Sequence, residues 1–317
     1  MHIFICENNP NGILTGVYDA WEAKISSHCT HSDIRLLSSP PDNYALFCEY
    51  HNVVSSAEKS GKVASTLTQK LGQDFYDTIL SAILSVDLTS KKSMDKADAI
   101  YHTIVAALTS SKGARVLDHL GDPYIYRVFE LSRATLAEAH HLKGFLRFSE
   151  LKNGVLFSKI HPKNNALPIL AEHFTDRFPL ENFLIYDEVH QTAAMHRAGK
   201  YYMLVDTSDL NLELLSDYSE NETRFQDLWL TFFENIAIKA RTNPALQAQN
   251  IPKRFLSSCI LLFLSVFHRY IRLWNNKALV CRTNDLICCD QFLQSVCTPA
   301  NNSCDCKKWC IQLAWDS

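Results

Sequence analysis

Residues 142–206 read LKGFLRFSELKNGVLFSKIHPKNNALPILAEHFTDRFPLENFLIYDEVHQTAAMHRAGKYYMLVD, and they carry the clearest local pattern in the chain. Within this stretch, Asn153-Gly154 separates two runs with alternating apolar residues, 145–151 and 155–161. Both residues of the pair tolerate the positive φ of a type I′ turn. The pattern therefore predicts a β-hairpin closed by a two-residue loop.

A two-residue loop also decides which hairpin side chains share a face. Glu150 is then expected opposite Phe157, and Arg147 is expected on the more apolar face, which should pack on the core. A guanidinium on an inner face needs a carboxylate or a ligand anion. Arg147 is therefore expected either to pair with a structural carboxylate or to contact an anion in a cleft.

The rest of the stretch predicts one helix and three further strands. Asn165 is a suitable N-cap, Pro168 fits the first turn, and an apolar stripe runs to Phe178. The three strands are expected in short apolar runs at 183–186, 193–196 and 201–205. The expected order is strand, strand, helix, strand, strand, strand.

The chain before this stretch predicts short strands at 2–6, 34–37 and 44–49, with a helix at 12–24, followed by a mostly helical region. The expected fold class is α+β: an N-terminal strand–helix and a helical region, then a mainly antiparallel sheet packed with helices. The expected divisions are an N-terminal segment at 1–55, a helical region at 56–143, an α+β core at 144–255 and an atypical Cys-rich tail at 256–317.

Composition places the chain among foldable globular proteins, since 47% of its 317 residues are hydrophobic and 21% are charged. The formal net charge of −3 argues against a protein that coats DNA by charge alone, but it permits a local basic groove. The first residues lack the cationic and apolar regions of a secretory signal, and the longest apolar run, 259–267, is short for a membrane span. We therefore expect a cytoplasmic protein.

A second helix with an apolar face is expected from Phe225 to Ile236, and an acid-free segment follows it from Asn235 to Arg254. Cations and amides without acids suit phosphate contacts, although a solvated face at a domain edge has the same composition. The candidate contacts in this segment are Lys239, Arg241, Asn243, Lys253 and Arg254.

The tail holds eight of the eleven cysteines, but their spacing lacks the two close pairs of a zinc site. Cys306 and Cys310 match the first step of a radical-SAM cluster motif, whose third ligand would fall on Leu313. We therefore expect neither a metal site nor a cofactor, and we expect a chain ending near Leu256 to remain folded.

Two long motifs carry a family resemblance: GFLRFSELKNGVLFSKIHPKNNALPILAEHFTDRFPLENFLIYDE at 144–188 and LWLTFFENIAIKARTNPALQAQNIPKRF at 228–255. With RVLDHLGDP at 115–123 and the N-terminal strand–helix, the chain over about 1–255 resembles the DUF4130 family. These are bacterial proteins labelled as DNA repair or DNA metabolism proteins and associated with a radical-SAM protein. The resemblance implies that context, and it supplies no established catalytic residues.

Three functions follow from these observations. The favoured one is a DNA-repair accessory protein that binds nucleic acid or its radical-SAM partner. Besides the acid-free segment, the residues expected to bind are Arg147, Lys159, His161, Asn165 and Arg177. The alternative is an enzyme acting on a nucleotide or a DNA end, with His161 or His173 as general acid–base and Arg147 or Arg177 holding a phosphate. The third is a structural scaffold.

Overall fold

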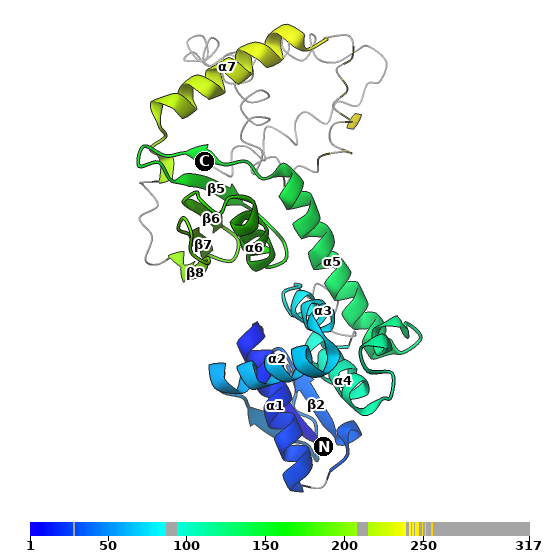
Figure 1. The fold of residues 1–317 in the computed structure, drawn as a ribbon. Helices are drawn as coiled ribbons and strands as arrows, with labels where there is room; N and C mark the ends of the chain where they lie inside the picture. Colours follow the sequence, from blue (N-terminus) through cyan, green and yellow to red (C-terminus); the bar gives the residue numbers. More distant parts are fainter. Residues whose placement is uncertain are drawn as a thin grey trace, which may run out of the picture. The chain divides into compact units, whose positions relative to one another are not determined.

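The computed structural model describes residues 1–27, 29–86, 94–207 and 215–238, together with isolated positions from Arg241 to Phe255. The chain divides into two units, Met1–Leu261 and Leu262–Ser317, and all described residues belong to the first. Helices and two sheets make up this unit (Figure 1), so the predicted α+β class is confirmed.

The N-terminal part contains a three-stranded parallel sheet in the order β2-β1-β3. Its strands are β1 (His2–Ile5), β2 (Ile34–Leu37) and β3 (Glu49–Asn52). The expected strand at 44–49 is wrong, because β3 begins only at its last residue. Phe47 has a φ of 61° and is 97% exposed, which is incompatible with a paired strand.

Helices pack around this sheet and share one hydrophobic core with it. They are α1 (Pro10–Ser27), α2 (Ala57–Leu71), α3 (Gln73–Ile83), α4 (Lys96–Thr109) and α5 (Pro123–Phe145), with 3-10 turns η1 (His31–Asp33) and η2 (Gly113–Asp118). Asp122 caps α5 as the sequence predicts, accepting from the backbone N–H groups of Tyr124 and Ile125. One core thus spans the segments expected at 1–55 and 56–143.

The second sheet has five strands in the order β4-β5-β6-β7-β8. They are β4 (Ser149–Glu150), β5 (Leu156–Ile160), β6 (Phe183–Asp187), β7 (Thr192–His196) and β8 (Met203–Asp206), and α6 (Leu167–Arg177) lies between β5 and β6 in sequence. Only β5 and β6 pair in parallel, so the predicted mainly antiparallel sheet and the predicted order of elements are confirmed.

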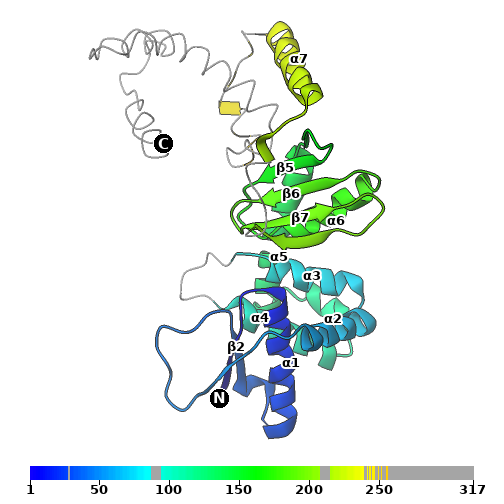
Figure 2. The same ribbon diagram turned by 90° about the vertical axis from the view of Figure 1, so that its left-hand side faces the viewer.

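Both faces of this sheet are covered, which explains why every residue of β6 is buried. Phe183 and Ile185 join Phe174 of α6 in one apolar cluster, and Figure 2 shows α6 beside the sheet. Leu184 and Tyr186 point to the opposite face and pack with Leu215 and Tyr218, among others. Alternating side chains therefore enter two cores.

The hairpin at Asn153-Gly154 is confirmed, but its predicted loop length is wrong. The Leu151 N–H donates to the Val155 carbonyl at 2.9 Å, so three residues form the loop. Glu150 pairs with Leu156, one residue away from the predicted register. Gly154 has a φ of 78°, which fits a type I turn followed by a left-handed residue.

Arg147 also lies where the sequence did not place it. Helix α5 continues to Phe145 with Leu146 as its C-cap, so Arg147 follows a helix end and is exposed. Its Nη1 donates to the carbonyls of Gly144, at 2.9 Å, and of Leu146, at 2.8 Å. The predicted inner-face position is wrong, because carbonyls left over at the helix end satisfy the guanidinium.

The predicted N-cap of α6 is wrong as well. Ala166 occupies that position, without a side-chain cap. The Asn165 N–H instead donates to the Leu84 carbonyl at 3.0 Å, next to α3. A backbone contact to another helix thus decides the position of Asn165, where local capping preference predicted a different role.

Helix α7 (Glu220–Ile236) confirms the helix with an apolar face that was predicted from Phe225 to Ile236. The Ser219 Oγ caps this helix by accepting from the Glu222 N–H, and it donates to Glu150 Oε2 at 2.8 Å. None of its residues is buried among the described part of the chain, and Phe225 is 70% exposed. Among the residues that the structure describes, no helix combines the length and apolar character needed to cross a membrane.

Candidate functional site at the ends of strands β5 and β6

The parallel pair β5–β6 brings two polar loops to one edge of the sheet. Ile160 lies opposite Asp187, and the Glu188 N–H donates to the Ile160 carbonyl at 3.1 Å. Both strands therefore end at the same edge, where their loops, 161–166 and 188–191, begin. Crevices beyond the carboxyl ends of parallel strands commonly hold ligands in α/β sheets, so this edge is the first place to look for a site.

Two of the predicted residues meet here on one carboxylate. Lys159 Nζ lies 2.6 Å from Glu188 Oε2, and His161 Nε2 contacts the same oxygen. The three side chains keep 42%, 37% and 36% of their surface exposed, for Lys159, His161 and Glu188 in turn. Lys159 and His161 can therefore reach a bound anion. Without a ligand, Glu188 holds both side chains in position. The sequence prediction missed Glu188.

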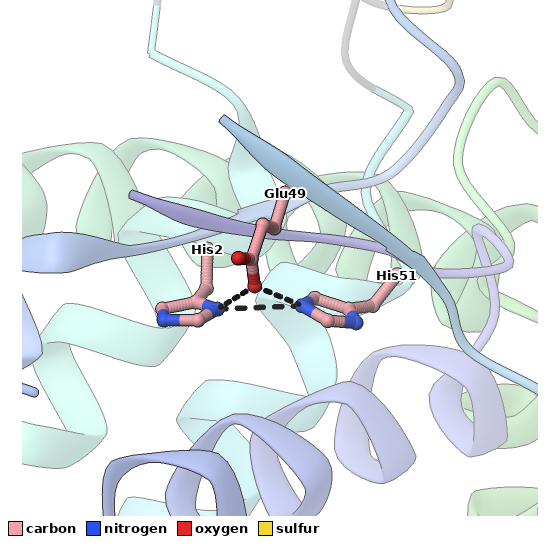
Figure 3. A group of neighbouring side chains, drawn as sticks. All are labelled: His2, Glu49 and His51. Carbon is pink, nitrogen blue, oxygen red and sulfur yellow. Dashed lines mark hydrogen bonds and ion pairs between the residues drawn. The ribbon is translucent and has the colours of Figure 1, made fainter. Parts of the chain in front are cut away.

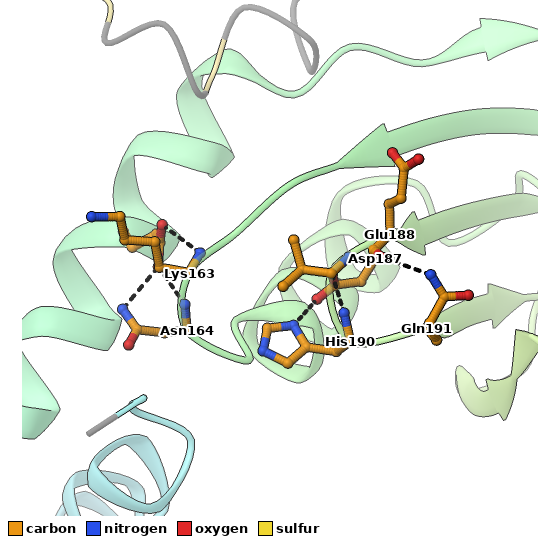
Figure 4. Close-up of polar contacts among 8 residues, drawn as sticks. Lys163, Asn164, Asp187, Glu188, His190 and Gln191 are labelled. Atoms are coloured by element: carbon orange, nitrogen blue, oxygen red, sulfur yellow. Dashed lines mark hydrogen bonds and ion pairs between the residues drawn. The ribbon is translucent and has the colours of Figure 1, made fainter. Parts of the chain in front are cut away.

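A second pair lies on the loop after β6 and was also missed. Asp187 is fully buried, and its Oδ1 accepts from Val189 N at 2.9 Å and His190 N at 3.1 Å. Its Oδ2 lies 2.7 Å from His190 Nδ1 (Figure 4). If Nδ1 carries the proton, Nε2 is an acceptor, as in a general base oriented by a carboxylate. The signal was present in the sequence: Asp-x-x-His directly after an apolar strand.

A buried glutamate of α5 holds the loop after β5, residues 161–166, in place through hydrogen bonds. Glu138 is 3% exposed and accepts from Lys163 N at 3.0 Å, Asn164 N at 2.8 Å and Asn164 Nδ2 at 2.8 Å. The Asn164 Oδ1 in turn accepts from Val86 N at 2.9 Å. Figure 4 shows Lys163 and Asn164 on this loop. The network positions the loop and leaves the Lys163 side chain exposed.

A pocket of about 410 Å³ opens beside the same loop. Its lining includes three cationic or titratable side chains, Arg127, His141 and Lys163, and two acids, Glu130 and Glu138. Arg127 pairs with Glu130 at 3.5 Å. The pocket therefore extends the polar surface from the strand ends to α5, with both signs of charge on its wall.

The remaining predicted residues of the core gather around α6. Burial lowers the pKa of His173, and the nearby charges of Lys143 and Arg177 lower it further. Arg177 also lies over the Phe178 ring, 5.8 Å from its centroid. His173 and Arg177 of α6 thus lie near Lys143 of α5, on different elements from the Lys159–His161 pair.

The structure describes two of the five candidate residues in the acid-free segment. Lys239, Lys253 and Arg254 lie outside the described residues. Arg241 and Asn243 are described and exposed, and Asn243 Oδ1 accepts from Leu246 N at 3.0 Å. The phosphate contacts predicted for this segment therefore stay a prediction.

Together, the fold and this edge define an α+β protein with a polar, partly cationic surface at the ends of two parallel strands. Residues 94–259, just over half of the chain, match the family described as a domain of unknown function, DUF4130. The chain therefore belongs to the DUF4130 family. The match contains all the site residues described above, and the resemblance over residues 1–93 stays a prediction. The comparison with curated proteins gives no match.

Proposed function

We propose that this protein is a cytoplasmic, nucleic-acid-binding accessory protein of DNA repair that works with a radical-SAM partner enzyme. The observation that carries the proposal is the exposed pair of Lys159 and His161 on Glu188. Lys163, two residues further on, adds an exposed cation to the same loop. The repair context and the partner come from the resemblance to DNA repair and DNA metabolism proteins.

The chemistry of this edge suits contacts to the phosphate backbone. Phosphate oxygens accept from lysine and histidine, and such contacts position a protein on nucleic acid without reading its sequence. Glu188 limits the affinity, because a phosphate must compete with its carboxylate for the same donors. This edge offers two or three phosphate contacts, and the chain has a net charge of −3, so its affinity for DNA alone should be low. A protein of this kind depends on a partner for tight binding.

Binding of labelled duplex and single-stranded DNA to the full chain, measured by fluorescence anisotropy at several salt concentrations, tests this proposal. Lys159→Ala should weaken binding similarly for all sequences and reduce the log–log salt slope by about one. Lys200→Ala is the matched control, since Lys200 is an exposed lysine in the turn after β7, at the opposite end of the sheet.

Two outcomes would overturn the proposed surface. One is an affinity that does not depend on salt, and the other is a Lys159→Ala protein that binds DNA like Lys200→Ala. If Lys159→Ala instead loses the radical-SAM protein in a pull-down while keeping DNA, the edge is a protein–protein contact.

The Asp187–His190 pair favours a second candidate, an enzyme acting on a nucleotide or a DNA end. His190 would remove a proton from the attacking group, and the buried Asp187 would stabilise the resulting imidazolium. The pure protein, with and without its radical-SAM partner, can be assayed on damaged and undamaged oligonucleotides. Turnover by the protein alone, lost in His190→Ala but kept in His161→Ala, would select this candidate and assign the role to His190.

A further inference from the structure

Three metal-ligating side chains lie together on the parallel sheet, away from the sequence motifs discussed above. The parallel pairing of β1 and β3 sets His2 opposite Glu49. His51 follows Glu49 by two positions and so projects from the same face of β3. Figure 3 shows a ring nitrogen of His2 and a ring nitrogen of His51 directed toward each other, beside the Glu49 carboxylate.

The separations between the three ligand atoms match a single ion. His2 Nδ1 lies 3.2 Å from Glu49 Oε2 and 3.4 Å from His51 Nε2, and the latter lies 4.0 Å from Glu49 Oε2. A circle through three atoms at these distances has a radius of about 2.1 Å, which is close to zinc–nitrogen and zinc–oxygen bond lengths. An ion at its centre would reach all three atoms without movement of the backbone.

The fold also holds one of these rings in place. His51 stacks on Phe4, with ring centroids 4.9 Å apart and an interplanar angle of 23°. Phe4 is 5% exposed and belongs to the N-terminal core. The Nε2 of His51 is therefore presented by a ring that rests on a rigid support, and little side-chain freedom is left to lose on binding.

We propose that His2, Glu49 and His51 bind one divalent first-row transition-metal ion, with Zn²⁺ as the best-matched probe. Two imidazoles select such ions over Ca²⁺ and Mg²⁺, which prefer oxygen ligands. Three protein ligands leave coordination positions for water or for an anionic ligand. The side chains of His2, Glu49 and His51 are 20%, 72% and 44% exposed, so the ion exchanges with solvent.

The competing interpretation is a surface histidine–carboxylate pair with no ion. Equilibrium dialysis of the full chain against Zn²⁺, with the bound metal counted per chain, separates the two. The cysteines of the chain can also hold zinc, so the test compares the number of zinc ions bound per chain in each variant with that in the parent. His51→Ala should lose one equivalent relative to the parent. His140→Ala, which removes an exposed histidine of α5, should lose none.

Three further measurements sharpen this test. Glu49→Gln should weaken Zn²⁺ binding by at least about tenfold, since loss of a residue that only hydrogen-bonds a metal ligand already costs that much. Zn²⁺ binding should weaken as the pH is lowered, because metal binding releases protons from its ligands. Co²⁺ bound at this site should show visible bands without thiolate charge transfer, and Cys48→Ser, next to Glu49, should leave these bands unchanged.

Two results would overturn the site. One is an equal zinc stoichiometry in the parent and His51→Ala, both checked for an unchanged circular dichroism spectrum. The other is a Co²⁺ spectrum dominated by thiolate charge transfer and abolished by Cys48→Ser, which would assign the ion to a cysteine. Glu49 and His51 are exposed, and because His51→Ala removes a ring that stacks on Phe4, the circular dichroism spectrum also checks that the core is retained.

Discussion

Glu138 and Glu188 support neighbouring loops of the same sheet, but their surroundings are opposite. Glu138 is 3% exposed and accepts three hydrogen bonds from backbone and amide groups of Lys163 and Asn164. Glu188 keeps 36% of its side chain exposed and holds the nitrogen atoms at the tips of Lys159 and His161. One glutamate fixes the path of the main chain, and the other holds side chains that a ligand can take over.

The difference shows that burial and the kind of donor decide what a carboxylate does. A buried acceptor whose donors have no other partner contributes strongly to stability, because its removal leaves those donors desolvated. An exposed ion pair contributes about 0–1 kcal/mol, so its partners exchange easily with solvent or phosphate. Stability and binding should therefore respond separately to substitutions in the two regions.

The largest effect is expected at Glu138. Glu138→Ala leaves the N–H groups of Lys163 and Asn164 without their acceptor and leaves the Asn164 amide only the Ala134 carbonyl, at 3.4 Å, which should cost about 3–4 kcal/mol of unfolding free energy. Urea unfolding followed by circular dichroism measures it. His140→Ala, at an exposed position on the same helix, should stay within about 0.5 kcal/mol of the parent. Equal losses in both variants would contradict the structural role of Glu138.

A pH-dependent effect is expected at Asp98, a buried carboxylate with fewer donors. Burial raises the pKa of Asp98 to about 6, and a hydrogen bond from Leu36 N only partly opposes the shift. The folded-state pKa lies above the ordinary aspartate value of 3.8, so the folded state binds the proton more tightly. Stability from this group is full below about pH 4 and is lost as pH rises to about 6.

The loss amounts to roughly 2–3 kcal/mol, at about 1.4 kcal/mol for each pKa unit. Asp98→Asn should remove it, so the variant should gain stability relative to the parent between pH 4 and pH 7. Unfolding midpoints in urea at both pH values measure this change. His102, 3.7 Å away, faces the same carboxylate, and His102→Gln separates its own titration from that of Asp98. A parent-like pH profile in Asp98→Asn would rule out this explanation.

A smaller effect is expected at Gly154, whose turn sets the register of β5 and therefore the position of Lys159. Gly154→Val places a β-branched residue at a φ of 78°, which should cost about 1–2 kcal/mol. Gly61→Val in the exposed middle of α2 is the control and should be neutral or slightly stabilising. An unchanged unfolding midpoint in Gly154→Val would mean that the turn does not restrain the hairpin.

The smallest stability effect is expected at Glu188. Glu188→Gln should change the free energy of unfolding by less than about 0.5 kcal/mol, because its partners remain solvated. DNA binding should tighten, since Lys159 and His161 no longer have a competing carboxylate. Anisotropy titrations of parent and variant at one salt concentration measure this. Weaker binding in Glu188→Gln would show that Glu188 is needed to orient the side chains of Lys159 and His161.

The sequence predicted what depends on short-range pattern. Lys159 lies in β5 and His161 follows its last residue, so the two side chains are two positions apart in either hairpin register and both reach Glu188 despite the wrong loop length. Arg147 was misplaced because α5 runs two residues further than the predicted helical region, to Phe145, so Arg147 follows the helix C-terminus and does not lie in a strand.

Other site features depend on contacts that no local pattern encodes. Glu138 lies in the middle of an amphipathic helix, where a glutamate normally faces water, and only the packing of the 161–166 loop gives it donors. His2 and Glu49 are neighbours because β1 and β3 pair in parallel across a long intervening segment. The sequence contained all these residues, but their partners became visible only in three dimensions.

The position of β1 at the centre of the parallel sheet has a consequence for synthesis of the chain. β1 leaves the ribosome before both of its neighbours, β2 and β3, and β3 is complete only at Asn52. At about 5–20 residues per second, β1 therefore waits roughly 2–9 s for its second edge. Until β3 is made, the apolar side chains of Ile3, Phe4 and Ile5, which are buried in the folded protein, lack part of the cover that the complete sheet gives them.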